Sequence, residues 1–191
     1  MNTHIADTTP VRLGRAQYFQ AQHIAPDGGY EDQWVPVEVG PLRFAFPNTA
    51  ARRRAVRFHD LHHVATGYGT DHVGESEIGA FEIGGGCGAH GPAWVLNLYA
   101  LMLGLGNEPA RLLPAFVRGR RSGTLYHAPW DESLLDLSVG ELRARLGLDR
   151  DLSPPTLGER LAFYGWMAVA LLFSLAPLVL LALGVWGLLA R

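Results

Sequence analysis

The chain of 191 residues contains no lysine and only one cysteine, Cys87. A single cysteine excludes an intramolecular disulfide framework and a zinc site built from several thiolates. All 16 basic residues are arginines, and 18 acidic residues leave a formal net charge of −2. This slightly acidic balance argues against nucleic acid as a partner. No repeat with a period of roughly 20–50 residues is visible, which argues against a solenoid.

Charge is also missing from one long segment near the C-terminal end. The 30 residues 161–190 lie between Arg160 and Arg191, and 25 of them are apolar. As a straight helix this segment would be about 45 Å long, against roughly 30 Å of bilayer hydrocarbon. Pro177 lies near its middle and predicts a kink or a break. We expect one tilted or kinked transmembrane helix; the alternatives are a buried core helix and a re-entrant hairpin folded at Pro177.

The arginines around this apolar segment predict its orientation. Four arginines precede it closely, and only Arg191 follows it; the four are Arg143, Arg145, Arg150 and Arg160. By the positive-inside rule, the domain before the segment stays on the cytoplasmic side. The first 15 residues contain no apolar stretch typical of a cleaved secretory signal. The sequence therefore predicts a membrane protein with a single-pass C-terminal anchor.

The sequence divides into four expected parts. These are a flexible N-terminus (1–17), a mainly α-helical domain (18–150), a linker (151–160) and the transmembrane anchor (161–190). Within the domain, alternating valines at 35–39 predict a short edge strand or hairpin. Asn48 or Thr49 as the cap and Gly67 as the end predict a helix over 50–66. Breakers and apolar runs predict helices over 75–83, 92–105 and 134–148, and a basic helix with a loop over 109–123. The glycine cluster 84–88 is expected to be a flexible connector, because no G-K-[ST] follows it to form a phosphate-binding loop.

Histidines and carboxylates gather in the segment HDLHHVATGYGTDHVGE, which starts at His59. His59 and His63 are four residues apart, so they share one helix face and can hold one metal ion between them. Asp60 borders that face, and Glu75 follows a glycine-containing loop that can fold back. Imidazole and carboxylate ligands suit Zn²⁺, Fe²⁺ or Mn²⁺. The alternative is a helix whose histidines serve only in packing. Supporting or substitute ligands are sought among His72, Glu77 and Glu82.

Two further segments leave a functional and a structural interpretation open. The apolar run 93–105 predicts either a core helix or the wall of a channel for a lipid tail. Arg118, Arg120 and Arg121 predict either a solvated basic face or contacts with anionic head groups or a substrate carboxylate.

The segment HDLHHVATGYGTDHVGE fits the pattern H-D-x-x-H, eleven residues, then E, and so resembles the Coq4 family of ubiquinone biosynthesis proteins. The likeness continues through Ala80-Phe81-Glu82, the arginine-rich stretch 118–121, Pro129-Trp130-Asp131-Glu132 and LSVGELRARLGL, and it covers residues 44–148. The resemblance implies a mainly helical fold that binds a divalent metal, Zn²⁺ or Fe²⁺. It implies the ligands His59, Asp60, His63 and Glu75.

The resemblance also implies a function at a membrane surface. The expected activity is metal-dependent oxidative decarboxylation and hydroxylation at ring position C1 of a polyprenylated, benzoate-type quinone precursor. Other quinone-biosynthesis proteins are expected partners, and a homodimer is left open. The glycine cluster 84–88 and the C-terminal span depart from the family pattern. Two alternatives therefore stay open: a non-catalytic lipid-binding scaffold and an unrelated membrane-anchored metallohydrolase. No catalytic residue beyond the metal site is identified.

Overall fold

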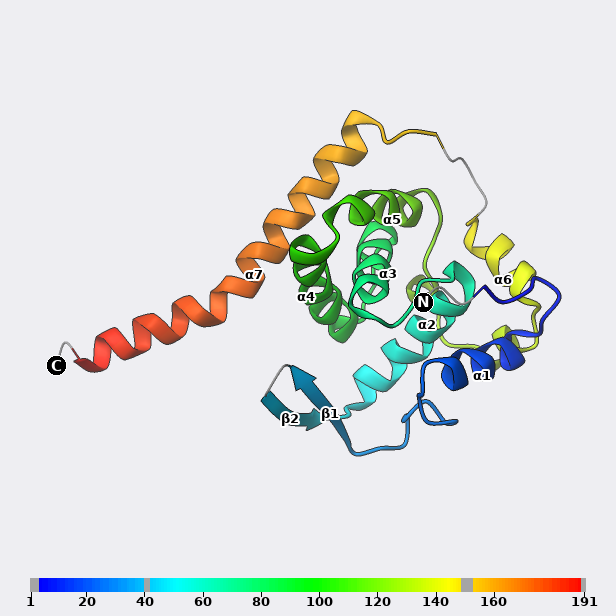
Figure 1. Ribbon diagram of the computed structural model, residues 1–191, viewed down its shortest axis with the longest axis horizontal. Helices are drawn as coiled ribbons and strands as arrows, with labels where there is room; N and C mark the ends of the chain where they lie inside the picture. Colours follow the sequence, from blue (N-terminus) through cyan, green and yellow to red (C-terminus); the bar gives the residue numbers. More distant parts are fainter. Residues whose placement is uncertain (1–3, 40–41, 149–152, 190–191) are drawn as a thin grey trace.

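The computed structural model describes residues 4–39, 42–148 and 153–189. Within these ranges the chain is mainly helical, as predicted, with one small antiparallel hairpin (Figure 1). The elements in chain order are α1 (Val11–Ala21), β1 (Trp34–Val39), β2 (Leu42–Pro47), α2 (Ala50–Thr66), α3 (His72–Gly85), α4 (Gly91–Asn107), α5 (Pro109–Arg121), the 3₁₀ turns η1 (Leu125–His127) and η2 (Glu132–Leu135), α6 (Val139–Leu146) and α7 (Leu157–Leu189). The predicted strand at 35–39 is confirmed as the first strand of the hairpin.

The N-terminal segment packs against α6 and the residues that precede it. Val11 donates its backbone N–H to the Leu137 carbonyl at 2.7 Å, and Asp7 forms an ion pair with Arg143. The prediction of a flexible segment over 1–17 is wrong for its described part. The spacing of the apolar residues in α1 is helical, and this helix buries one face in the core through Val11, Gly14, Tyr18 and Phe19.

The two helices that carry the histidine and carboxylate cluster have well-defined ends. The Thr49 side chain caps α2 by accepting a backbone N–H from its first turn, and Gly67 ends the helix in the left-handed region at φ 78°. The end at Gly67 was predicted, and the cap was predicted at Asn48 or Thr49. α3 begins at His72, three residues earlier than predicted, because the Asp71 carboxylate caps its first turn.

α3 and α5 approach so closely that only glycine fits at their contact. A Cβ at Gly119 would lie 1.9 Å from the Phe81 carbonyl oxygen, and a Cβ at Gly84 would lie 2.1 Å from the Phe116 carbonyl oxygen. The interpretation of 84–88 as a flexible connector is therefore wrong for its first two residues. They form the last turn of α3 and let it pack on α5.

The predicted helix over 134–148 is interrupted. η2 covers its first residues, and α6 begins only after Ser138. Ser138 and Glu141 form a reciprocal cap in which each side chain accepts the other residue's backbone N–H. This capping box favours a new helix start over continuation of the preceding turn.

α7 is one continuous helix through Pro177, which excludes the hairpin alternative. It begins four residues before the predicted boundary at 161 and so shortens the predicted linker. Thr156 and Glu159 cap its start, with Glu159 N–H donating to Thr156 Oγ1 at 3.2 Å and Thr156 N–H donating to Glu159 Oε2 at 2.8 Å. Figure 1 shows α7 changing direction near the middle of its length, as a proline in a helix predicts.

The two parts of α7 have different surroundings. Phe163, Met167 and Ala170 are buried against α4 and α5, whereas the apolar residues from Leu171 onward are exposed. The stretch Leu157–Trp186, whose most apolar 18-residue window has a mean hydropathy of 2.6, is long and apolar enough to cross a membrane. The second part projects away from the domain (Figure 1).

Candidate metal centre

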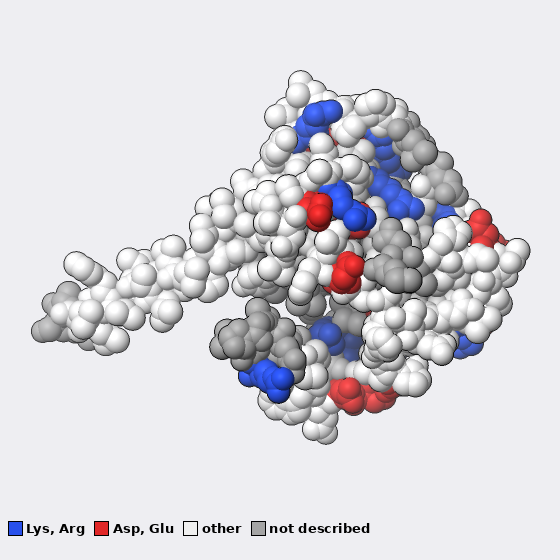
Figure 2. Space-filling view, viewed as in Figure 1, with Lys and Arg blue, Asp and Glu red and all other residues white. Residues whose placement is uncertain are grey.

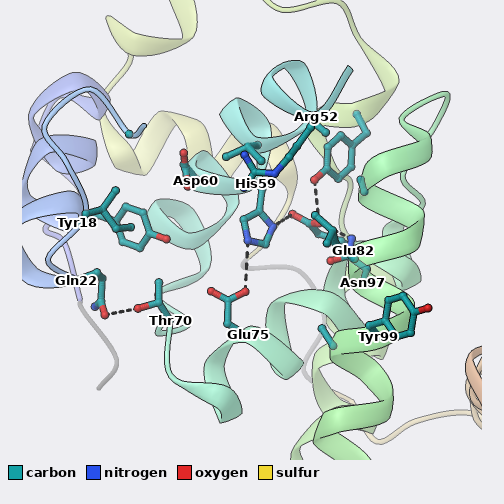
Figure 3. Close-up of a pocket in the computed structure, with 18 of the residues that line it drawn as sticks. Tyr18, Gln22, Arg52, His59, Asp60, Thr70, Glu75, Glu82, Asn97 and Tyr99 are labelled. Atoms are coloured by element: carbon teal, nitrogen blue, oxygen red, sulfur yellow. Dashed lines mark hydrogen bonds and ion pairs between the residues drawn. The ribbon is translucent and has the colours of Figure 1, made fainter. Parts of the chain in front are cut away.

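Three of the four predicted ligands meet between α2 and α3. His59, His63 and Glu75 each offer a ligand atom, and these atoms all lie within 4.8 Å of one another. The Nε2 atoms of the two histidines are 3.0 Å apart. The two Glu75 carboxylate oxygens lie 3.6 Å from His59 Nε2 and 3.6 Å from His63 Nε2, respectively. The cluster lies at the wall of a cavity, where Figure 3 shows Glu75 facing the His59 ring.

Local sequence explains this meeting. His59 and His63 lie one helical turn apart on α2, which places both imidazoles on the same face. The loop from Gly67 then reverses the chain so tightly that a Cβ at Gly74 would lie 2.2 Å from the Gly69 carbonyl oxygen. Glycine at both points therefore allows α3 to return Glu75 to the histidine pair. The predicted fold-back of this loop is confirmed.

The outer ring nitrogen of each histidine is already held by the protein. His59 Nδ1 lies 3.0 Å from Glu82 Oε1, and His63 Nδ1 lies 2.9 Å from the Tyr68 carbonyl oxygen. Both partners are acceptors, so each Nδ1 donates a proton and leaves Nε2 as the ligand atom. Tyr18 stacks on His63 at a centroid distance of 5.2 Å and fixes that ring further. This is the tautomer and support that metal-bound histidines require.

The two inward-facing Nε2 atoms need a cation between them. Two imidazole lone pairs at 3.0 Å repel unless one nitrogen is protonated or a metal ion binds both. Burial disfavours protonation of His59, but the Glu82 and Glu75 carboxylates outweigh it and raise the pKa of His59 well above its usual value. Burial and the neighbouring His59 lower the pKa of His63 to about 4. The site thus concentrates one positive charge between two carboxylates.

The separations between the histidine Nε2 atoms and the Glu75 carboxylate oxygens suit a small divalent ion. Metal–nitrogen and metal–oxygen bonds of about 2.1 Å in tetrahedral geometry place ligand atoms roughly 3.4 Å apart. The 3.0 Å between the two Nε2 atoms and the 3.6 Å from each Nε2 to a different Glu75 oxygen bracket that value. Two histidines and one carboxylate fit Zn²⁺ or Fe²⁺ and leave further coordination positions for water or substrate.

Asp60, the fourth predicted ligand, lies near this cluster but is not part of it. Its Oδ2 accepts a hydrogen bond of 2.5 Å from the Tyr30 hydroxyl. In Figure 3 its carboxylate is turned away from Glu75. Burial raises the pKa of Asp60 to about 6. Its position one residue after His59 rotates it about 100° around the helix, and its role as a ligand stays a prediction.

Glu82 organises a polar network that sequence reasoning did not resolve. Its Oε1 receives His59 Nδ1 and also His62 Nδ1, the latter at 2.7 Å. Its Oε2 accepts from Asn97 Nδ2 at 2.6 Å and from the Tyr126 hydroxyl at 2.9 Å. Burial opposes its ionisation, yet the two histidines hold the pKa of Glu82 well below its usual value. The spacing of Glu82 seven residues after Glu75, two helical turns, was the available signal.

Other predicted candidates have structural partners. Glu77 forms a bidentate pair with Arg111, with both contacts at 2.9 Å, and His72 lines the cavity without joining the cluster. Arg118 donates to the Thr66 carbonyl. Arg121 binds Glu159 through two hydrogen bonds of 2.7 and 2.8 Å. The basic residues in the last turn of α5 therefore serve in part to join α5 to α2 and α7.

The cavity beside the cluster has a polar end and an apolar wall. Its volume is about 660 Å³. Arg52, His59, Asp60, Glu75 and Glu82 lie at the polar end, and α4 supplies Ala93, Leu96, Tyr99, Ala100 and Leu103. Arg52 is two turns before His59 on α2, and its buried Nε has no hydrogen-bond partner among the described residues. The cavity therefore offers a guanidinium donor beside a candidate metal site.

Comparisons with known proteins add no assignment. No family model matches the sequence, and no curated protein or solved structure matches the chain.

Proposed function

We propose that this chain is a membrane-anchored, metal-dependent enzyme that modifies a polyprenylated quinone precursor. The observation that carries the proposal is the His59–His63–Glu75 cluster, in which both Nδ1 atoms are held and both Nε2 atoms face inward. The cavity beside it supports an amphiphilic substrate, because its polar end continues into an apolar wall. The sequence resemblance to the Coq4 family names the reaction: oxidative decarboxylation and hydroxylation at ring position C1.

The residues of the cavity fit such a substrate. Arg52 would pair with the ring carboxylate, since this arginine lines the polar end of the cavity. Leu96 and Leu103 would contact the isoprenoid tail. When bound, a divalent metal would polarise the carboxylate and activate O₂ or water. Asp60 and the Tyr30 hydroxyl lie close enough to exchange a proton at this end of the cavity.

Lipid mass spectrometry of a strain that lacks this chain tests the proposal. We expect a prenylated, still carboxylated precursor to accumulate and the wild-type chain to remove it. A His63→Ala chain should fail to do so. If His63→Ala restores quinone production, the chain is a scaffold rather than an enzyme. An unchanged quinone pool in the deletion strain, together with hydrolysis of lipid esters or amides by the purified protein, would support a metallohydrolase instead.

A further inference from the structure

We propose that the C-terminal half of α4 lies in the bilayer surface, so that the candidate metal cavity opens toward lipid. This inference rests on the membrane anchor of the proposed function. It adds the face by which the domain contacts the membrane.

The first observation is the length of α7 that is free of the domain. From Leu171 to Leu189 the helix has 19 residues, which span about 28 Å. This nearly equals the roughly 30 Å of bilayer hydrocarbon. The apolar segment as a whole is longer than the bilayer hydrocarbon is thick. Its residues before Leu171 pack on α4 and α5, so this extra length belongs to the domain. The membrane boundary therefore falls close to Leu171.

The second observation is where α4 meets α7. Trp94 stacks on Trp166 at a centroid distance of 5.1 Å, and Tyr99 contacts Phe173 at 5.4 Å. The two contacts follow the same order along both helices, so α4 runs toward the same side as the free end of α7. The contact at Phe173 lies at the inferred boundary. The α4 residues after Tyr99 therefore extend to the bilayer or into it.

The third observation is the chemistry of the exposed side of α4. No charged residue occurs between Gly91 and Asn107. Leu96, Tyr99 and Leu103 form one exposed stripe at helical spacing. Leu103 is the most exposed of the three, at 58%. Figure 2 shows that the projecting part of α7 also lacks charge on its visible face, whereas charged residues lie on the domain. An uncharged stripe continuous with a membrane helix fits the acyl region below the head groups.

The stripe also forms the rim of the cavity. Leu96, Tyr99 and Leu103 line the same space as His59 and Glu75. With this stripe in the bilayer surface, a lipid-soluble ligand passes from the membrane to the metal cluster without crossing water. The anchor then holds the cavity entrance at the membrane, where a substrate can enter without leaving the lipid phase.

Spin labels on the full chain in phosphatidylcholine vesicles test the inference. Cys87 is fully buried, so each introduced cysteine supplies the accessible thiol. The test position is Leu103→Cys. The matched controls are Leu13→Cys, an exposed leucine (52%) on α1, and Leu180→Cys (69%) on the free half of α7. Collisions with O₂ report lipid, and collisions with a water-soluble nickel complex report water.

The label at 103 should resemble the label at 180, with an O₂-to-nickel collision ratio several-fold above that at 13. A label at 103 that behaves like the one at 13, while 180 reports lipid, overturns the inference and leaves the anchor intact. A label at 180 that reports water contradicts both. Dipolar broadening between labels at 103 would show that a second copy of the chain covers α4, and would also overturn the inference. The metal content of the purified chain is measured separately and does not depend on the spin labels. A failure of the proposed metal site is therefore distinguished from a failure of this inference.

Discussion

At the scale of single residues, the candidate site depends on groups that contact the ligands as much as on the ligands. Glu82 is the clearest case, because one buried carboxylate binds His59, His62, Asn97 and Tyr126. It orients His59 and keeps its Nδ1 protonated. Partners of this kind usually change metal affinity by about 10–100-fold when they are removed.

We therefore expect Glu82→Gln to lower the affinity for Zn²⁺ about 10–100-fold, because a neutral amide is a weaker acceptor for His59 Nδ1. Competition against a chelating dye measures this constant. Glu77→Gln is the matched control, since Glu77 lies on the same helix but pairs with Arg111 outside the cluster. Equal affinities for the two variants would show that Glu82 does not support the site.

At the scale of elements, much of the local structure follows from sequence patterns and the tertiary contacts do not. The pair His59 and His63 was predictable because helical periodicity is local, and Gly67 marked the end of α2. The place of Glu75 depended on a loop whose glycines could be recognised. The contact of Gly84 with α5 joins residues about 35 positions apart, and no local pattern reveals it. The packing of α1 on α6 was missed for the same reason.

Because α3 and α5 are in close contact, we expect one methyl group added between them to destabilise the fold. Gly119→Ala should lower the free energy of unfolding by about 1–3 kcal/mol, because the new Cβ overlaps the Phe81 carbonyl oxygen. Gly106→Ala in α4 is the control, since a Cβ there meets nothing within 4 Å. Thermal unfolding in mild detergent, followed by circular dichroism, compares them. A Gly119→Ala protein as stable as Gly106→Ala would contradict this account of the packing.

The junction between α5 and α7 predicts a pH dependence. Arg121 and the Thr156 backbone hold the pKa of Glu159 down at about 2, from a usual 4.5. A lowered folded-state pKa stabilises the folded chain above pH 4.5, and this contribution disappears as the pH falls toward 2. Carbon NMR of the Glu159 carboxyl group should show this low titration. In Arg121→Gln the midpoint should rise toward 4.5; an unchanged midpoint would contradict the role of Arg121.

At the scale of the whole molecule, one helix joins two environments. The first part of α7 belongs to the domain core, and the exposed second part has the length of a membrane span. Its apolar character and Pro177 were evident in the sequence. Its division near Leu171 was not, because burial of Phe163, Met167 and Ala170 depends on partners in α4 and α5.

The arginine distribution predicts which side of the membrane carries the domain. By the positive-inside rule, four arginines before the span and only Arg191 after it predict a domain on the cytoplasmic side. Protease added to intact cells should spare the domain, and protease added to inside-out vesicles should digest it. Digestion in intact cells would contradict the predicted orientation.

The most direct test of the account is the metal content of the purified full chain. After reconstitution with Zn²⁺ or Fe²⁺ and removal of excess metal, the wild-type protein should retain about one ion per chain by mass spectrometry of the elements. His59→Ala, His63→Ala and Glu75→Ala should each lose it, while Glu77→Gln should retain it. Stoichiometric metal that persists in all three alanine variants would contradict the central claim that His59, His63 and Glu75 form the metal site.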